Sequence, residues 1–539
     1  MKKNGFTLVE LLAVIAILAI LVILALPNVL SMFNGAKKDI FLTEAKNVFK
    51  EVSKKYISEN MKGNKITAIN SKTGSKLDMD TSNLEYDIIL DNKGNVKSFV
   101  VSDGTYCLIS NSSDINDLTI DSIREDCSYE TLHNLAGTLD KDYYKIALGS
   151  DANKGIVNSI SFYSDNRKFN SDLTDGNPVD VSEEKNGSVL LYANYSADNS
   201  SLIDLNIVAN GKIMFPEDSS YLLAFYSGGG CISDSKITGI NLNYAVDTHK
   251  VKNMSFMFAQ AVPFGLMSTY YYWGGGFTSQ PINDLDLSYF DTSNVTDMSC
   301  MFIGNQSKSI NVSSFNTDNV IDMSGMFFGA SRVTELNLKS FNTSKIDNTA
   351  YMFDHTSSLL KLDLSNFDTK NVDYMGYMFS GTTSLKSLNI KNFDTSKVTS
   401  MNYMFSNCGA SDIDVSSFNT SNVTDMRCMF SGIKVKNLLL NNFNTSKVTI
   451  MDNMFSGSSF DKLDISSFNT SKVTDMSSMF YGTDVSVLDL SSFDVSNVRR
   501  TNNMFSNSKA TIGYAKDSAS ANKLNSTSNI PSKLKFVVK

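Results

Sequence analysis

The sequence predicts an α+β protein of several domains: a long N-terminal helix with a small β head, a β-rich middle domain, and a solenoid of about ten repeats of 25–26 residues. Three observations lead to this prediction. An apolar run opens the chain, short alternating apolar and polar segments follow it, and a phenylalanine-centred motif then recurs with a period of 25 or 26 residues. The 539-residue chain also exceeds what one hydrophobic core usually holds.

The first element is the apolar run 6–26, which holds 21 residues and no lysine or arginine. A helix of that length is about 31 Å long and matches the roughly 30 Å hydrocarbon core of a bilayer. Lys2 and Lys3 precede the run, so the positive-inside rule leaves the N-terminus in the cytoplasm and the rest of the chain outside. We therefore expect a single-pass membrane protein that faces the outside of the cell.

Glu10 is a carboxylate inside this apolar run. A charge near the centre of a spanning helix costs about 2.5–3.5 kcal/mol or more, so Glu10 needs a partner. No nearby cation of the segment supplies one, because the next after Lys3 is Lys37. A free amine at a newly cut Phe6 of a neighbouring chain could supply one.

These residues resemble the N-terminal signal of type IV pilins and pseudopilins, with a short basic leader, residues 1–5, that ends in Gly5 and is followed by the sequence FTLVELL. The resemblance implies that a membrane prepilin peptidase cuts between Gly5 and Phe6 and that Phe6 is then N-methylated. It also implies that the helices of many pilin subunits assemble into a filament core, in which the Phe6 amine of one subunit neutralises Glu10 of another. The alternative is that 6–26 is an uncut membrane anchor.

The helix is expected to continue to residue 60, because apolar residues recur at helical spacing and form one stripe that packs on a pilin-like head at 61–135. The stripe consists of Phe41, Ala45, Val48, Phe49, Val52 and Tyr56. In the head, the runs 86–90 and 96–101 flank a turn and predict a hairpin. Cys107 and Cys127 flank the end of this block, and in an exported chain they are predicted to form a disulfide.

A second small β-rich domain is predicted at 136–239. Short runs such as 187–192 and 202–207 alternate apolar and polar residues, which is typical of half-buried strands. The sequence does not indicate what this domain does.

The repeats extend over 240–512, and residues 513–539 are expected to form a C-terminal cap or tail. Each clear repeat has a phenylalanine in an S-F-[DN]-T motif and a second one 12 residues later that follows a methionine. The first set is Phe290, Phe315, Phe341, Phe367, Phe393, Phe418, Phe443, Phe468 and Phe493. The second set is Phe302, Phe327, Phe353, Phe379, Phe405, Phe430, Phe455, Phe480 and Phe505.

One repeat of this length cannot bury its own apolar face, whereas stacked copies build a continuous core. An L-x-L-like pair in each repeat is expected to be a short strand, as at Leu285 and Leu287. Two residues after each Met-Phe pair stands Gly or Asn, types that tolerate positive φ, so this column predicts a turn. His355 is the exception in that column, and we interpret it as a turn residue and not as a ligand.

The unit L-x-L-S-S-F-[DN]-T-S-x-V-T-x-M-x-x-M-F-x-G closely resembles the BspA-like leucine-rich repeat of bacterial surface proteins, once catalogued as a domain of unknown function. The resemblance covers 180–512 and reaches into the segment 213–221, which is similar to the lead-in of such repeats. It implies a leucine-rich-repeat solenoid displayed at a cell surface. Thr349 and Thr501 stand where most repeats carry the first methionine of the M-x-x-M-F motif. In the last repeat, Val495 also stands where the other repeats carry the threonine of the S-F-[DN]-T motif. A last repeat that exchanges apolar for polar residues, as at Thr501, suits the end of a solenoid.

The insertion 259–281 separates the first, degenerate repeat from the second and contains Tyr270, Tyr271, Tyr272 and Trp273 before three glycines. Exposed aromatic side chains on a glycine-flanked loop suit contact with a sugar or a protein. Equally, these residues could fold back and cover the first turn of the solenoid. Both interpretations stay open here.

Composition excludes several classes of function. A net charge of -8 without a dense basic run argues against nucleic acid as a partner of the solenoid. The three histidines are far apart and no cysteine pair has zinc-knuckle or CxxC spacing, so we predict no metal site and no cofactor. The recurring methionines are expected to be core residues. The catalytic motifs sought are absent in a credible context, so we predict no catalytic residues and a protein that is not an enzyme. The pairing of the other cysteines (Cys231, Cys300, Cys408 and Cys428) is not assigned.

These observations predict a bacterial type IV pilin-like subunit, minor or at the filament tip, that displays the solenoid for adhesion or protein–protein interaction. The alternatives are a pseudopilin of a type II secretion or competence DNA-uptake system, and an uncleaved membrane-anchored adhesin. Expected partners are the prepilin peptidase, other pilin subunits, and the membrane before assembly. The ligand of the solenoid, a host or bacterial surface protein or a glycan, is not indicated by the sequence.

Overall fold

The computed structural model of the 539-residue chain describes residues 8–62, 66, 68–71, 76–79, 81, 83–90, 93–110, 114–124, 133–134, 156–164, 178–196, 199–224, 238–260 and 282–539. Of residues 8–34, only the backbone is described. The chain divides into two compact units, Met1–Thr131 and Leu132–Lys539.

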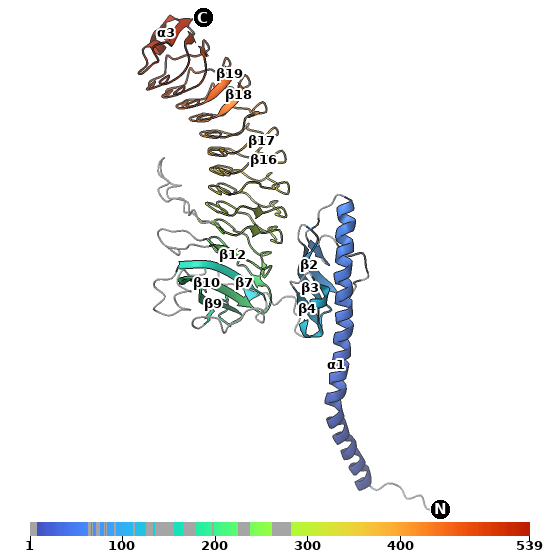
Figure 1. The fold of residues 1–539 in the computed structure, drawn as a ribbon. Helices are drawn as coiled ribbons and strands as arrows, with labels where there is room; N and C mark the ends of the chain where they lie inside the picture. Colours follow the sequence, from blue (N-terminus) through green and yellow to red (C-terminus); the bar gives the residue numbers. More distant parts are fainter. Residues whose placement is uncertain are drawn as a thin grey trace, which may run out of the picture. The chain divides into compact units, whose positions relative to one another are not determined.

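The first unit combines a long helix with an antiparallel sheet. Helix α1 spans Leu8–Met61. The sheet has the order β1-β2-β3-β4-β5, with β1 at Ala68–Asn70, β2 at Glu85–Leu90, β3 at Val96–Ser102, β4 at Cys107–Ser110 and β5 at Ile123–Arg124. Two 3-10 turns, η1 (Ile115–Asp117) and η2 (Ile120–Ser122), follow β4. Strands β2 to β4 lie beside α1 in Figure 1, and the β2–β3 pairing confirms the predicted hairpin.

The apolar stripe of α1 forms the core of this unit. Phe41, Ala45, Val48 and Val52 are at most 1% exposed, because the sheet covers their side of the helix. The Phe49 ring lies 5.1 Å from that of Phe99 on β3. The stripe predicted from helical spacing is therefore confirmed for these residues.

The second unit begins with a mixed sheet of order β12-β7-β10-β9-β8. Its strands are β7 (Ile156–Tyr163), β8 (Val179–Asp180), β9 (Val189–Ser196), β10 (Asn199–Ala209) and β12 (Gly239–Asn241). The runs predicted as strands at 187–192 and 202–207 fall mainly on β9 and β10, which pair antiparallel, while β12 and β10 pair parallel with β7. A small parallel sheet consists of β6 (His133–Asn134), β11 (Ile213–Met214) and β13 (Val246–Asp247), with β11 between the other two strands.

From Asp218 onward, turns of the chain stack on one another in parallel (Figure 1). One parallel bridge joins each turn to the next, at Asp218, Asn253, Asp297, Asp322, Asn348, Tyr374, Ser400, Asp425, Ile450, Asp475 and Arg500. The stack starts one turn before the predicted first repeat, since Leu223 N–H donates to the Met257 carbonyl at 3.0 Å. The lead-in segment is thus itself a turn of the stack.

Some L-x-L pairs form short parallel strands, as predicted. These are β14 (Leu285–Asp286), β15 (Ile310–Asn311), β16 (Lys361–Asp363), β17 (Ser387–Asn389), β18 (Lys434–Leu439), β19 (Ser459–Asp464) and β20 (Val487–Leu490). Elsewhere, as around Leu338, the pair is buried but lies outside any strand.

Two phenylalanine ladders and a threonine ladder hold the turns together. The phenylalanine of each Met-Phe pair, from Phe258 to Phe505, stacks on its counterpart in the next turn, with ring centroids 5.4–6.0 Å apart. Each threonine from Thr292 to Thr470 in the S-F-[DN]-T motif is at most 2% exposed and donates to a carbonyl of the next turn at 2.8–3.1 Å. Most of these hydroxyls also accept a backbone N–H from that turn, so both hydrogen-bonding roles are satisfied.

The C-terminal end of the stack is closed by residues 512–539. Strands β21 (Ile512–Ala515) and β22 (Lys535–Val538) extend the sheet of β20, and helix α3 (Ser518–Asn525) lies between them in the chain. The Asn525 side chain donates to the Phe536 carbonyl and accepts its N–H, both at 2.9 Å. This amide takes the hydrogen-bonding place that a further strand would occupy.

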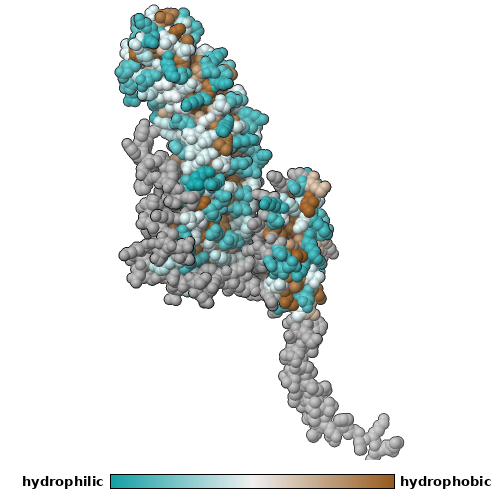
Figure 2. Space-filling view, in the orientation of Figure 1, coloured by the Kyte–Doolittle hydropathy of each residue, from teal (hydrophilic) through white to brown (hydrophobic). Residues whose placement is uncertain are grey.

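One hydrophobic core runs from Val157 to Phe536, so the β-rich segment and the stacked turns share their interior. The finer domain boundaries expected from the sequence stay predictions. The visible surface of the stack is mainly hydrophilic or intermediate in hydropathy, with apolar side chains scattered over it (Figure 2). In the part of the chain that the structure describes, no helix has the length and hydropathy to cross a membrane.

Candidate functional site

The residues of the predicted N-terminal signal do not form a site in the part of the chain that the structure describes. Lys2, Lys3, Gly5 and Phe6 lie outside the described residues, and of Glu10 only the helical backbone is described. Their roles in cleavage, methylation and assembly stay predictions. The same holds for the insertion residues, since 261–281 lie outside the described residues.

Cys107 lies at the start of β4 and is disulfide-bonded. Its predicted partner, Cys127, lies outside the described residues, so the pairing stays a prediction. Cys300, Cys408 and Cys428 are buried free thiols. Burial raises the pKa of the Cys300 and Cys428 thiols to about 12, which disfavours the reactive thiolate form.

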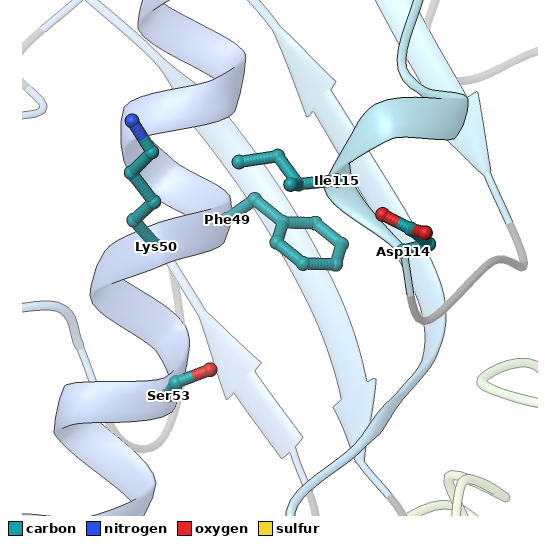
Figure 3. A pocket seen from close by; sticks show the side chains of 5 residues that line it. All are labelled: Phe49, Lys50, Ser53, Asp114 and Ile115. Atoms are coloured by element: carbon teal, nitrogen blue, oxygen red, sulfur yellow. The ribbon is translucent and has the colours of Figure 1, made fainter.

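A shallow cavity of about 560 Å³ lies between α1 and η1 in the first unit. Figure 3 shows Phe49 projecting from α1 toward Ile115 and Asp114, while Lys50 extends along the helix. The Asp114 carboxylate caps η1 by accepting the Asn116 N–H at 2.9 Å. This cavity therefore combines an apolar floor with a capping carboxylate and contains no pair of groups arranged for catalysis.

Two columns of residues with positive φ run along one side of the stack. The first is the turn column predicted after each Met-Phe pair, and it includes His355 with φ 56°, which confirms its interpretation as a turn residue. The second column precedes each Met-Phe pair and was not predicted. It consists of Tyr221, Phe256, Cys300, Gly325, Tyr351, Tyr377, Tyr403, Cys428, Asn453, Ser478 and Asn503, all with φ between 54° and 62°.

Three successive turns place a tyrosine in this second column. Tyr351 and Tyr377 have ring centroids 4.6 Å apart, and Tyr377 and Tyr403 are 4.4 Å apart, with planes within 15° of parallel. All three side chains are partly exposed. Their backbone N–H groups donate to carbonyls of the following turn at 2.9–3.1 Å, which fixes the register of the rings. The recurring Y-M-F sequence is the signal that could have identified them.

Polar groups surround the stacked tyrosines. The Tyr374 hydroxyl donates to the Asn402 side-chain oxygen at 3.0 Å, and both groups pass over Gly376, where a Cβ would collide with them. Arg427 Nε donates to Asp425 at 3.2 Å and lies 4.0 Å from a carboxylate oxygen of Asp452. We call Tyr351, Tyr374, Tyr377, Tyr403 and Arg427 the tyrosine face; Asn402 is 4% exposed and is not part of it.

Asp354 and His355 form a hydrogen-bonded pair beside the tyrosine face, with His355 Nδ1 2.6 Å from Asp354 Oδ1. Burial raises the pKa of the Asp354 carboxyl, and the hydrogen bond from His355 opposes this effect. The hydrogen bond to Asp354 raises the pKa of the His355 imidazole. The His355 ring faces Gly381 in the next turn, and Asp354 is its carboxylate partner, so this pair supports the turn.

Metal-binding geometry is absent from the part of the chain that the structure describes, where no three His, Cys, Asp or Glu side chains converge. The described polar groups of the stack are mostly engaged in capping turns, as at Asp322, which accepts the Ser324 N–H at 2.7 Å. The arrangement suits binding along an extended surface. The prediction that the protein is not an enzyme stays a prediction.

Comparison with known families agrees with the two resemblances. Residues 1–26 match the prokaryotic N-terminal methylation motif. The family described as "Mycoplasma protein of unknown function, DUF285" matches three overlapping segments, 276–384, 357–456 and 410–517. No curated protein and no solved structure matches the chain significantly.

These matches define a pilin-type N-terminal methylation signal joined to BspA-like repeats of the DUF285 family. This is the fusion that the sequence predicted. The signal supports a surface pilin-like protein, and the repeats occupy the stacked turns of the second unit.

Proposed function

We propose that the protein is a minor or tip subunit of a type IV pilus-like filament and that its stacked turns form a leucine-rich-repeat solenoid that mediates adhesion. The N-terminal methylation motif at 1–26 carries the proposal, because such a signal directs processing by a peptidase and assembly with other pilins. In this account, 6–26 crosses the membrane before assembly. Glu10 then pairs with the methylated Phe6 amine of a neighbouring subunit.

The size of the second unit supports a minor or tip position. It contains residues 132–539, far more than the first unit, and a subunit with such a head suits a sparse or terminal position better than a densely packed shaft. The stacked turns expose a long surface built from side chains that vary between turns, as the tyrosine face does. Surfaces of this kind in repeat proteins serve as extended binding faces.

Mass spectrometry of the mature N-terminus tests the proposal, with sheared surface material and the membrane fraction analysed separately. We expect an N-methylated Phe6 in the sheared fraction, at low abundance relative to the shaft subunit. The same terminus confined to the envelope would instead assign the chain to a secretion or DNA-uptake pseudopilus. An intact Met1 in both fractions would identify an uncut membrane-anchored adhesin.

A matched pair of variants sharpens this test. Glu10→Ala removes the carboxylate that pairs with the Phe6 amine, so we expect cleaved protein that stays in the membrane fraction. Glu44→Ala, a carboxylate on the later part of α1, serves as the control and is expected to reach the sheared fraction. Equal recovery of both variants on filaments would contradict the role of Glu10.

A further inference from the structure

The sheet that ends the stack exposes aliphatic side chains on its outer face. Buried residues alternate with outward-facing ones along β20 and β21, and β22 continues their register. Val487, Ile512 and Val537 are outward-facing residues of the three strands and are 41%, 44% and 51% exposed. Tyr514 lies beside Val537 in register on the same face. We call Val487, Ile512, Tyr514 and Val537 the apolar patch.

The corresponding positions of the earlier turns are polar. The column that leads to Val487 and Ile512 carries a polar or charged residue in every turn from Asp284 to Lys462. The column that leads to Tyr514 carries aspartate or asparagine in every turn from residue 286 to residue 489, except at residue 439. The stacking of turns therefore does not require apolar residues on this face. Strands favour β-branched residues, but threonine would meet that preference without exposing apolar surface.

The carboxyl end of the chain is basic, although the whole chain has a net charge of -8. Residues 499–539 contain two arginines, six lysines and one aspartate. Four of these cations pair with aspartates of the stack, as Lys539 does with Asp489. Lys533 and Lys535 are exposed and have no ion pair with any residue that the structure describes, and Lys535 stands beside Ile512 in register. Unpaired positive charge therefore adjoins the apolar patch.

The face of this sheet is open, whereas the edge of its last strand is closed. Asn525 occupies the N–H and the carbonyl of Phe536, so a partner strand cannot pair with these groups. Figure 1 shows α3 and the carboxyl terminus at the end of the stack opposite to β7 and β12. The apolar patch thus lies at the free end of the stack, where a large, flat partner can approach it.

An anionic lipid bilayer matches this combination of side chains. Aliphatic side chains enter the boundary between head groups and acyl chains, tyrosine favours the same boundary, and lysine reaches the lipid phosphates. The binding energy of a protein interface is instead concentrated in tryptophan, tyrosine and arginine seated in pockets, whereas the most exposed members of the patch are aliphatic and lie on a sheet face. A soluble anionic polymer would bind the lysines and leave the aliphatic side chains in water.

We propose that the apolar patch docks onto an anionic phospholipid bilayer. Val487, Ile512 and Val537 enter the lipid interface, and Lys533 and Lys535 bind lipid phosphates. This inference rests on the proposed adhesive function and names the kind of surface that the end of the stack contacts.

Flotation with lipid vesicles tests the proposal on the full-length chain, kept soluble in a non-ionic amphipol. The vesicles contain phosphatidylcholine alone or a mixture of phosphatidylcholine and phosphatidylglycerol. We expect the mixed vesicles to bind at least about tenfold more tightly, and this difference to shrink as sodium chloride is raised, because salt screens the attraction between lysine and phosphate. Attachment through the N-terminal apolar run is common to all variants and does not alter their comparison.

Two variants separate the apolar from the ionic contribution. The double variant Ile512→Thr, Val537→Thr keeps β-branched residues in the strands and removes exposed apolar surface, so binding to mixed vesicles should weaken by about tenfold. Lys535→Glu should weaken it by about tenfold or more, because the change reverses a charge at the lipid surface.

Matched controls come from the same columns of the stack, several turns away from the patch. Leu439→Thr removes a side chain that is 56% exposed, and Lys361→Glu reverses a charge on the same face. Both variants should bind within about twofold of the unmodified chain, because neither residue reaches the proposed lipid contact. If the double variant loses its cooperative circular dichroism transition, Val537→Thr alone replaces it.

The proposal is overturned if mixed vesicles bind no better than phosphatidylcholine vesicles, or if the controls weaken binding as much as the patch variants do. Loss of binding in Lys535→Glu with full binding in the double variant also overturns it, because ionic attraction alone would then explain the result. Patch-dependent binding to protein-coated surfaces without vesicle binding assigns the face to a protein partner and overturns it as well.

The N-terminus of the double variant is read in the sheared fraction of the same cells, so that the two proposals fail separately. An N-methylated Phe6 together with weakened vesicle binding supports the docking of the apolar patch. Patch-dependent vesicle binding by a chain that keeps Met1 in every fraction also supports the docking, but it contradicts the proposed filament function.

Discussion

Thr349 offers a sharp test of the packing argument, because its buried hydroxyl has no hydrogen-bond partner. It occupies a core position where most turns carry methionine, and the residue is 1% exposed. A buried hydroxyl without a partner costs about 1–3 kcal/mol. Thr349→Val keeps the shape and removes that hydroxyl, so we expect the free energy of unfolding to rise by about 1–2 kcal/mol.

Thr343 in the same turn is the matched control. Its hydroxyl donates to the Asp368 carbonyl at 3.0 Å and accepts the Asp368 N–H at 2.7 Å. Thr343→Val leaves that N–H without its partner and should lower stability by about 1–3 kcal/mol. Urea unfolding of the full chain in detergent, followed by circular dichroism, measures both changes. Effects of the same sign in the two variants would refute the reasoning.

Three further predictions follow from the described contacts. Asn525→Ala should lower the free energy of unfolding by about 1–3 kcal/mol and expose the edge of β22. Size-exclusion chromatography with light scattering should then detect self-association. A monomer of unchanged stability would contradict this prediction. The hydrogen bond to Asp354 raises the imidazole pKa of His355, so this bond stabilises the folded chain below pH 6.5, and the stabilisation is lost as pH rises through the folded-state pKa. His355→Asn should therefore be less stable than the unmodified chain below pH 6.5. Melting curves should show a larger difference at pH 5.5 than at pH 8.5. Cys300 and Cys428 should resist iodoacetamide at pH 8 in the folded chain and react after unfolding, as mapped by peptide mass spectrometry.

The interior of the stack could be predicted because the residues that recur at fixed positions in the sequence are the ones that are buried in the structure. A methionine and a phenylalanine at fixed positions in every repeat require an inward column, and the buried ladder from Phe302 to Phe505 has that form. The turn after Met-Phe was also predictable, since Gly and Asn indicate positive φ. His355 fits that column because its turn geometry is imposed by its neighbours.

The second positive-φ column could not be predicted in the same way. Tyrosine and cysteine do not indicate left-handed backbone, so the residue types at Tyr351, Tyr377 and Cys428 do not mark a turn, although the recurring Y-M-F sequence marks the tyrosines themselves. Hydrogen bonds between turns impose the conformation there, as from the Tyr377 N–H to the Asn402 carbonyl. The first turn of the stack was missed for a related reason, since Leu222 and Leu223 replace the Met-Phe pair that marks the other turns.

The pairing of β12 with β7 has a consequence for how the chain folds. It gives the first turns a finished sheet edge on which to form, and each later turn contacts a neighbour only about one repeat away in the chain. Turns can therefore be added one after another in the order of synthesis, without long searches for distant partners. At β22 the Asn525 side chain occupies the backbone groups of Phe536, so a further turn cannot pair with them.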